Sequence, residues 1–155
     1  MKSLLICFAL LVFAGCSNDD DTPAFTPQNI TPVLVGKGLL NPTPLFTRET
    51  RVITTPAQWQ QLLADMETAR EGITQDFTET AVDFTAYEVI AAYIVGSSGT
   101  TIDVIDVTEN EDTVTVTLDN LRQGATQDVT HPFHIIKIPS TTKPIVFNDI
   151  SNMNN

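Results

Sequence analysis

His131 and His134 are the side chains best suited to metal binding in this sequence, and Pro132 and Phe133 lie between them. Two histidines chelate one metal ion at i, i+4 on a helix or at i, i+2 on a strand. Residues three positions apart on a strand point to opposite faces, and the proline disfavours a helix. No cysteine or well-placed carboxylate completes a ligand set. We therefore predict no metal site.

The sequence also lacks a recognisable arrangement for catalysis. Serine, histidine and aspartate are all present, but no G-x-S-x-G turn presents a serine as a nucleophile. Asp103 and Asp106 are three apart in a predicted strand and should point apart. No phosphate-binding loop and no dinucleotide fingerprint occurs. We predict a protein that is not an enzyme and that binds no cofactor.

Cys16 is the residue with the most specific predicted chemistry. Lys2 is followed by the apolar run Leu4–Gly15, which is too short to span a bilayer but fits the apolar region of a secretory signal. The step Ala14-Gly15-Cys16, followed directly by polar residues, resembles the bacterial lipoprotein signal. That resemblance implies removal of residues 1–15 and lipidation of Cys16. A short anchor helix or an ordinary secreted protein is the alternative.

The residues after Cys16 indicate a membrane-attached tether. Two or more acyl chains give stable anchoring, where one gives only marginal binding. Ser17 is typical of outer-membrane lipoproteins, and Asp19-Asp20-Asp21 resembles an export tag for the cell surface, although a solvated tether explains it equally well. Residues 16–29 are therefore predicted to form a lipidated N-terminus and flexible tether. We expect an outer-membrane protein, on the periplasmic side or at the surface.

Charge and cysteine content limit the possible partners. The 155 residues carry a formal charge of −11, which argues against nucleic acid and against polybasic membrane contact. Cys7 lies in the predicted signal, so the mature chain would have no second thiol to pair with Cys16. The domain, predicted over residues 30–150, must fold by burial alone.

One amphipathic helix is predicted from about residue 55. Thr55 can cap it, Pro56 suits its first turn, Gln58 completes a capping box and Gly72 can end it. One apolar stripe at i, i+3, i+4 and i+7 should pack on a sheet; it consists of Trp59, Leu62, Leu63 and Met66.

The rest of the domain is predicted to form strands. The nearly continuous apolar run 88–95 predicts a strand buried on both faces. Alternation changes phase between Val104 and Ile105, which predicts a β-bulge, and a polar turn follows at 109–112. Further strands are predicted at 30–40, 45–54, 113–118, 133–138 and 145–147. The predicted fold is α+β, mainly β: an antiparallel sheet or sandwich of about six to seven strands with one packed helix.

The order of these features resembles the PrcB-like (protease complex subunit) family of bacterial lipoproteins over about residues 50–148. The matching positions are Trp59, Val82-Asp83-Phe84, Val89 to Val95, Ile102 to Leu118, Thr130 to Pro139 and Val146-Phe147. The resemblance implies a cell-envelope lipoprotein that assists a surface protease complex without being a protease. The family turn reads T-G-G-Y, whereas this chain has Ser98-Gly99-Thr100-Thr101.

These observations predict a lipid-anchored, non-catalytic binding protein of the cell envelope whose partner is an exported protein, for example a protease. The candidate contacts are the loop 120–130 and the loop formed by Gly96, Ser97, Ser98, Gly99, Thr100 and Thr101. Two alternatives remain: a protease inhibitor that inserts the loop 96–101 into a cleft, and a glycan or cell-wall binder. The glycan alternative would need aromatic platforms, and Trp59, the only tryptophan, is expected in the core.

Overall fold

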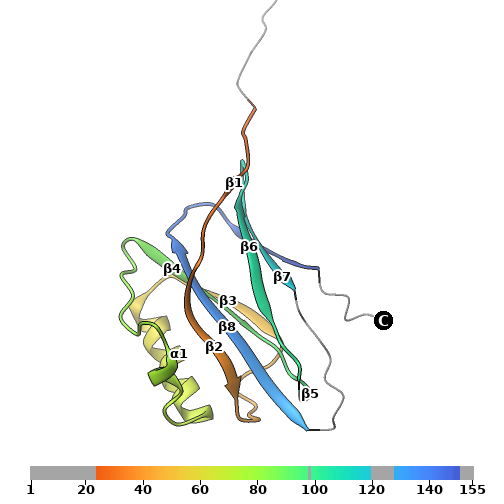
Figure 1. Ribbon diagram of the computed structural model, residues 1–155. Helices are drawn as coiled ribbons and strands as arrows, with labels where there is room; N and C mark the ends of the chain where they lie inside the picture. The colour runs from red at the N-terminus through yellow and green to blue at the C-terminus, as the bar shows by residue number, and fades with distance from the viewer. Residues whose placement is uncertain (1–23, 98, 120–127, 151–155) are drawn as a thin grey trace, which may run out of the picture.

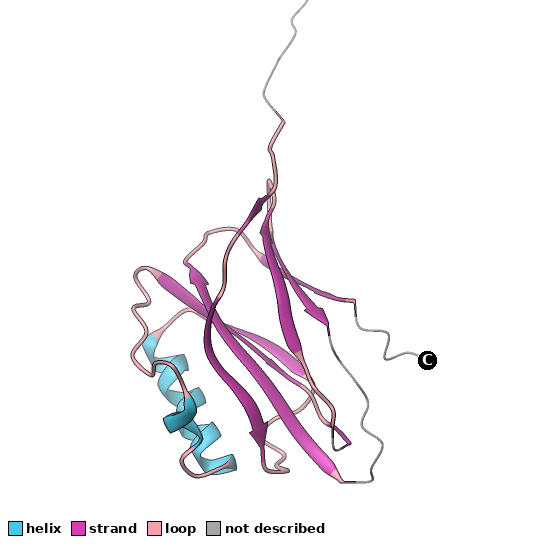
Figure 2. Cartoon of the chain, viewed as in Figure 1, coloured by secondary structure: helices cyan, strands magenta, loops and turns pink. Residues whose placement is uncertain are grey.

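The computed structural model describes residues 24–97, 99–119 and 128–150, and within these ranges it contains nine strands, one α-helix and one 3-10 helix (Figures 1 and 2). The elements are β1 (Gln28–Asn29), β2 (Val33–Leu40), β3 (Glu49–Ile53), α1 (Pro56–Ala69), η1 (Ile73–Asp76), β4 (Tyr87–Tyr93), β5 (Gly96–Ser97), β6 (Asp103–Glu109), β7 (Val114–Asp119), β8 (Val129–Pro139) and β9 (Ile145–Asp149). The predicted signal, Cys16, Ser98, residues 120–127 and residues 151–155 lie outside the described ranges.

The strands form two sheets. One has the order β1-β6-β7-β9, and the other has the order β2-β8-β4-β3, with β5 paired to an extension of β8. The predicted mainly β, α+β class is therefore confirmed. Every pair is antiparallel except β7–β9, which is parallel because the chain changes sheets between β8 and β9. The sequence did not predict that parallel pair.

Two hydrophobic clusters lie on the two faces of the five-stranded sheet. The first, under α1, includes Trp59, Met66 and Phe133; the second, between the sheets, includes Ile136 and Ile138. The molecule thus has three layers, with α1 on the outer face of the β2-β8-β4-β3 sheet (Figure 1). All residues of β4 from Glu88 onward are buried, as predicted, but the strand ends at Tyr93 and not at Val95, which is 39% exposed.

Helix α1 begins where the sequence predicted, but it ends at Ala69, before the predicted end at Gly72. The Gln58 N–H donates to Thr55 Oγ1 at 3.3 Å, and Gln58 Oε1 accepts from the Thr54 N–H at 3.1 Å, one residue earlier than in a standard capping box. Gly72 adopts a left-handed conformation, with φ of 77°, and starts η1. Of the predicted stripe, Trp59, Leu62 and Met66 are buried and Leu63 is partly buried.

The predicted bulge is also present, since the β6–β7 register shifts between Val104 and Asp106. The bulge makes the prediction about Asp103 and Asp106 wrong. Asp103 pairs with Asp119, and Asp106 pairs with Thr117, two residues earlier on β7. Because Ile105 is the extra residue of the bulge, Asp103 and Asp106 lie on the same face of the β6–β7 pair.

Some predicted strand boundaries were wrong. The strand predicted at 45–54 begins only at Glu49, and the strand predicted at 133–138 is longer, as β8. The segment that follows α1 contains η1, which starts at Ile73. Ile73 is 1% exposed and Phe77 packs against the first cluster, so this connection covers the sheet with two apolar side chains.

Candidate binding site

The predicted contact loop 96–101 is anchored at both ends. Gly96 and Ser97 pair with Thr130 and Val129 of β8, and the Thr100 N–H donates to the Ser97 carbonyl at 2.9 Å. Thr100 is 2% exposed, and a Cβ at Gly96 would lie 2.7 Å from Thr100 Cγ2. The absence of a side chain at Gly96 therefore lets Thr100 pack closely against it, and Gly96 also pairs with β8. Gly99, with φ of 91°, provides the left-handed turn.

A shallow apolar hollow of about 260 Å³ lies beside this loop. Three predicted loop residues, Gly99, Thr100 and Thr101, contribute to its wall. The remainder comes from the ends of β2 and β8 and from the start of the segment leading into β6: Lys37, Gly38, Leu39, Ile102, Pro132 and Phe133. The loop is therefore part of a surface that could receive an apolar side chain.

A polar cluster connects the two sheets next to this hollow. Lys37 of β2 forms an ion pair with Asp103 of β6, and Asp103 Oδ1 lies 3.4 Å from Nδ1 of His134 on β8. The Val104 N–H donates to His134 Nδ1 at 2.9 Å. Burial and the positive charge of Lys37 lower the pKa of His134 and outweigh the opposing effect of Asp103. This imidazole is therefore a neutral acceptor that holds β6 against β8.

His131 does not join this cluster. Its strand partner Leu40 belongs to the first hydrophobic cluster, so His131 occupies the face of β8 opposite to His134. This agrees with the predicted divergence of the two side chains. Among the residues that the structure describes, no three histidine, cysteine, aspartate or glutamate side chains are close enough to share a metal ion.

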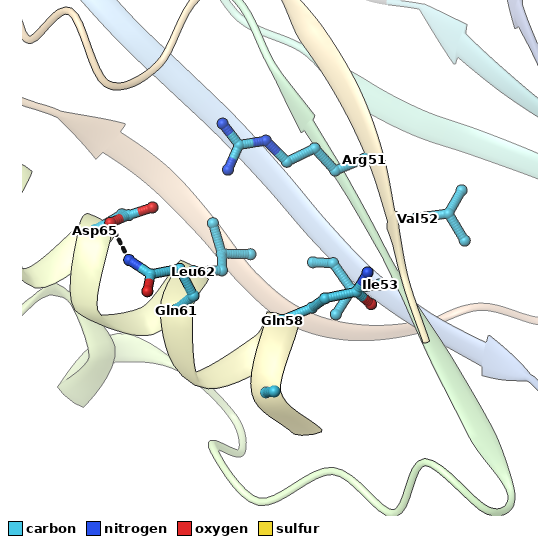
Figure 3. Close-up of a pocket in the computed structure, with 8 residues that line it drawn as sticks. Arg51, Val52, Ile53, Gln58, Gln61, Leu62 and Asp65 are labelled. Carbon is cyan, nitrogen blue, oxygen red and sulfur yellow. Dashed lines mark hydrogen bonds between the residues drawn. The ribbon is translucent and has the colours of Figure 1, made fainter. Parts of the chain in front are cut away.

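A larger apolar groove, of about 450 Å³, lies between β3 and α1 (Figure 3). Its apolar lining includes Ile53, which is 4% exposed, and Leu62, which is 2% exposed. The other lining residues are Arg51, Val52, Ala57, Gln58, Gln61 and Asp65. In Figure 3, Arg51 from the strand and Asp65 from the helix lie on opposite sides of the groove, and the Gln61 amide donates to Asp65 Oδ1 at 2.8 Å.

Arg51 is fixed in this groove by its neighbours. Its Nη2 is 2.6 Å from Glu49 Oε1, and its guanidinium lies 5.5 Å from the ring centre of Phe46 and 5.6 Å from that of Tyr93. Burial alone would disfavour the charge, but the hydrogen bond and charge of Glu49, with a contribution from Asp65, raise the pKa of Arg51. Arg51 therefore presents a permanent, oriented cation.

No family of proteins, no curated protein and no solved structure matches this chain. Across the described ranges, no helix has the length and apolar character needed to cross a bilayer.

The sequence did not reveal the β3–α1 groove. Its lining residues come from the strand predicted at 45–54 and from the predicted helix, whose apolar stripe includes Leu62, but the sequence does not show that β3 is the last strand of its sheet and lies beside α1. Trp59, by contrast, was placed correctly. It is 1% exposed and its indole N–H donates to the Thr80 carbonyl at 2.8 Å, so the indole offers no platform for a sugar ring.

Proposed function

We propose that this protein is a non-catalytic binding protein of the bacterial cell envelope, held in the outer membrane by lipid on Cys16. It contacts an exported partner protein through its folded domain. The single observation that carries the binding role is the apolar groove between β3 and α1, which lies at a sheet edge and holds a fixed cation. Apolar grooves with a few oriented polar groups are typical recognition surfaces.

The anchoring role is supported by the residues around Cys16, described above. The described chain begins just before β1, which lies at the opposite end of the domain from β5 (Figure 1). A tether attached at that end leaves both the loop 96–101 and the β3–α1 groove accessible. The resemblance to PrcB-like proteins supports a partner engaged in assembly of a surface protease complex.

The test is affinity capture of the full chain from its own cells after mild crosslinking. The same partner should be recovered in repeated experiments, and Cys16→Ala should release the protein from the membrane and lose that partner. Failure to recover any recurrent protein, with the chain folded and membrane-bound, would contradict the proposal. A glycan array run on the same material tests the cell-wall alternative.

A second candidate function is protease inhibition through the loop 96–101. It is favoured by the tight anchoring of this loop, with Thr100 buried and Gly99 and Thr101 exposed beside an apolar hollow. Nanomolar inhibition of a captured protease, lost on replacement of Thr101 by proline, would support inhibition over assistance in assembly.

A further inference from the structure

The two edges of the five-stranded sheet differ. Beyond β2, the chain covers the edge: the Thr78 N–H donates to the Val35 carbonyl at 2.8 Å, Thr78 Oγ1 donates to the Leu34 carbonyl at 2.7 Å, and Arg70 Nη1 donates to the Leu39 carbonyl at 3.0 Å. Beyond β3, no strand follows among the described residues. An edge strand presents unpaired N–H and C=O groups, which an added strand can satisfy.

The β3–α1 groove runs along this open edge. Because side chains alternate along a strand, an added strand would direct every second side chain toward the groove and the others away from it. Ile53 and Leu62 supply apolar contacts for a medium-sized apolar side chain, and Ala57 leaves room at the helical wall. The geometry of an open edge beside a helix therefore suits an extended peptide better than a folded surface.

The charges around the groove select the kind of peptide. Glu49 and Asp65 place two carboxylates around the single guanidinium of Arg51, which leaves an excess of negative charge. The whole chain is also acidic, with a formal charge of −11. A lysine or arginine on the partner would be attracted, whereas an acidic segment would be repelled.

We propose that β3 accepts an extended segment of the partner protein as an added strand, with apolar residues entering the groove and a basic residue beside Asp65. This assignment rests on the proposed binding function and specifies the partner's chemistry. The affinity comes from main-chain hydrogen bonds, and the selectivity comes from alternate side chains and charge.

The test uses a library of random peptides of about eight residues, a typical strand length, displayed against the full chain in detergent. Enriched sequences should alternate apolar and polar residues and contain lysine or arginine. Ala57→Trp fills the groove and should weaken the enriched peptides by at least about tenfold. Ala64→Trp is the matched control, because Ala64 is an exposed alanine of the same helix that does not line the groove.

A second variant tests charge selection. Asp65→Lys should shift enrichment from basic to acidic peptides, whereas Asp112→Lys, in the exposed turn between β6 and β7, should not. Hydrogen exchange should show slower exchange of β3 amides when peptide is bound. The assignment is overturned if no peptide is enriched, if Ala57→Trp binds as wild type does, or if protection falls on the loop 96–101.

The assignment is also overturned if the β3 strands of two copies pair with each other and thereby exclude the peptide. The two proposals can be tested separately: if Ala57→Trp captures a recurrent partner as well as the wild-type chain does, only the groove is refuted, whereas failure of the wild-type chain to capture any partner refutes the binding role.

Discussion

His134 shows how one side chain can make a contact between sheets depend on pH. Its Nδ1 accepts the Val104 N–H, so the neutral imidazole carries its proton on Nε2. Protonation of Nδ1 would abolish that acceptor beside Lys37, and Asp103 compensates only in part. The sequence predicted that His134 and His131 diverge, but it did not predict the partner, because Val104 and Asp103 reach His134 from another sheet.

Stability should fall when His134 is forced to bind a proton. The folded pKa is lowered from 6.5, so the unfolded chain binds the proton more readily. The contribution is complete above pH 6.5 and decreases as the pH falls through the folded pKa, by at most about 1.4 kcal/mol per pH unit for one proton. Urea unfolding at a series of pH values between 8 and 5 measures it.

His134→Asn is the informative control, because an amide oxygen can accept the Val104 N–H without titrating. This variant should lose the decline below pH 6.5 while remaining folded. An unchanged pH dependence in His134→Asn would show that other groups cause the decline.

At the scale of elements, α1 depends on its cap as well as on its buried stripe. Replacing Thr55 with alanine removes the acceptor of the Gln58 N–H and should cost about 1 kcal/mol. Thermal unfolding measures the loss. Thr142→Ala, at an exposed turn position, is the control and should change stability by less than about 0.5 kcal/mol; equal losses in both variants would contradict the capping role.

The loop 96–101 depends on the absence of a side chain at Gly96. In Gly96→Ala, the new methyl group would collide with Thr100, and we expect a loss of about 1–3 kcal/mol. Gly38→Ala is the matched control, since its Cβ would meet Phe133 at 3.4 Å, an ordinary contact distance. Calorimetry compares the two, and hydrogen exchange should show faster exchange at Thr100 only in Gly96→Ala.

The sequence predicted the helix and the strands better than it predicted which strands pair with one another. Local signals located α1, the bulge near Ile105 and the alternation of β7, because caps and periodicity act over a few residues. Pairing is set by contacts between distant residues, so the parallel β7–β9 pair and the open edge of β3 were not predicted. The groove, which depends on that edge, was missed for the same reason.

At the scale of the molecule, the two hydrophobic clusters share one sheet. Successive residues of β4, such as Ala91 and Ala92, face different clusters. If the packing of either cluster is lost, the sheet that both clusters share is disturbed, and the packing of the other cluster is disturbed with it. The described domain should therefore unfold in a single transition.

Ile138→Val tests this coupling. It removes a methyl group from the second cluster and should cost about 0.5–1.5 kcal/mol. Trp59 lies in the first cluster, yet its fluorescence should report the same shift in midpoint as far-UV circular dichroism. Ile105→Val, at a residue that is 47% exposed, should shift neither signal. Two separate midpoints in Ile138→Val would contradict the single transition.

The covered edge at β2 and the open edge at β3 also limit how copies of this protein can aggregate through strand pairing. A sheet with two open edges can add further copies at either end, so its growth has no natural limit. At β2, Thr78 and Arg70 donate to the carbonyls of Leu34, Val35 and Leu39, so among the described strands of this sheet β3 is the edge that is more open to extension. Pairing of two β3 edges would therefore join two copies of this sheet, and the contacts of Thr78 and Arg70 would oppose the addition of a third copy at β2.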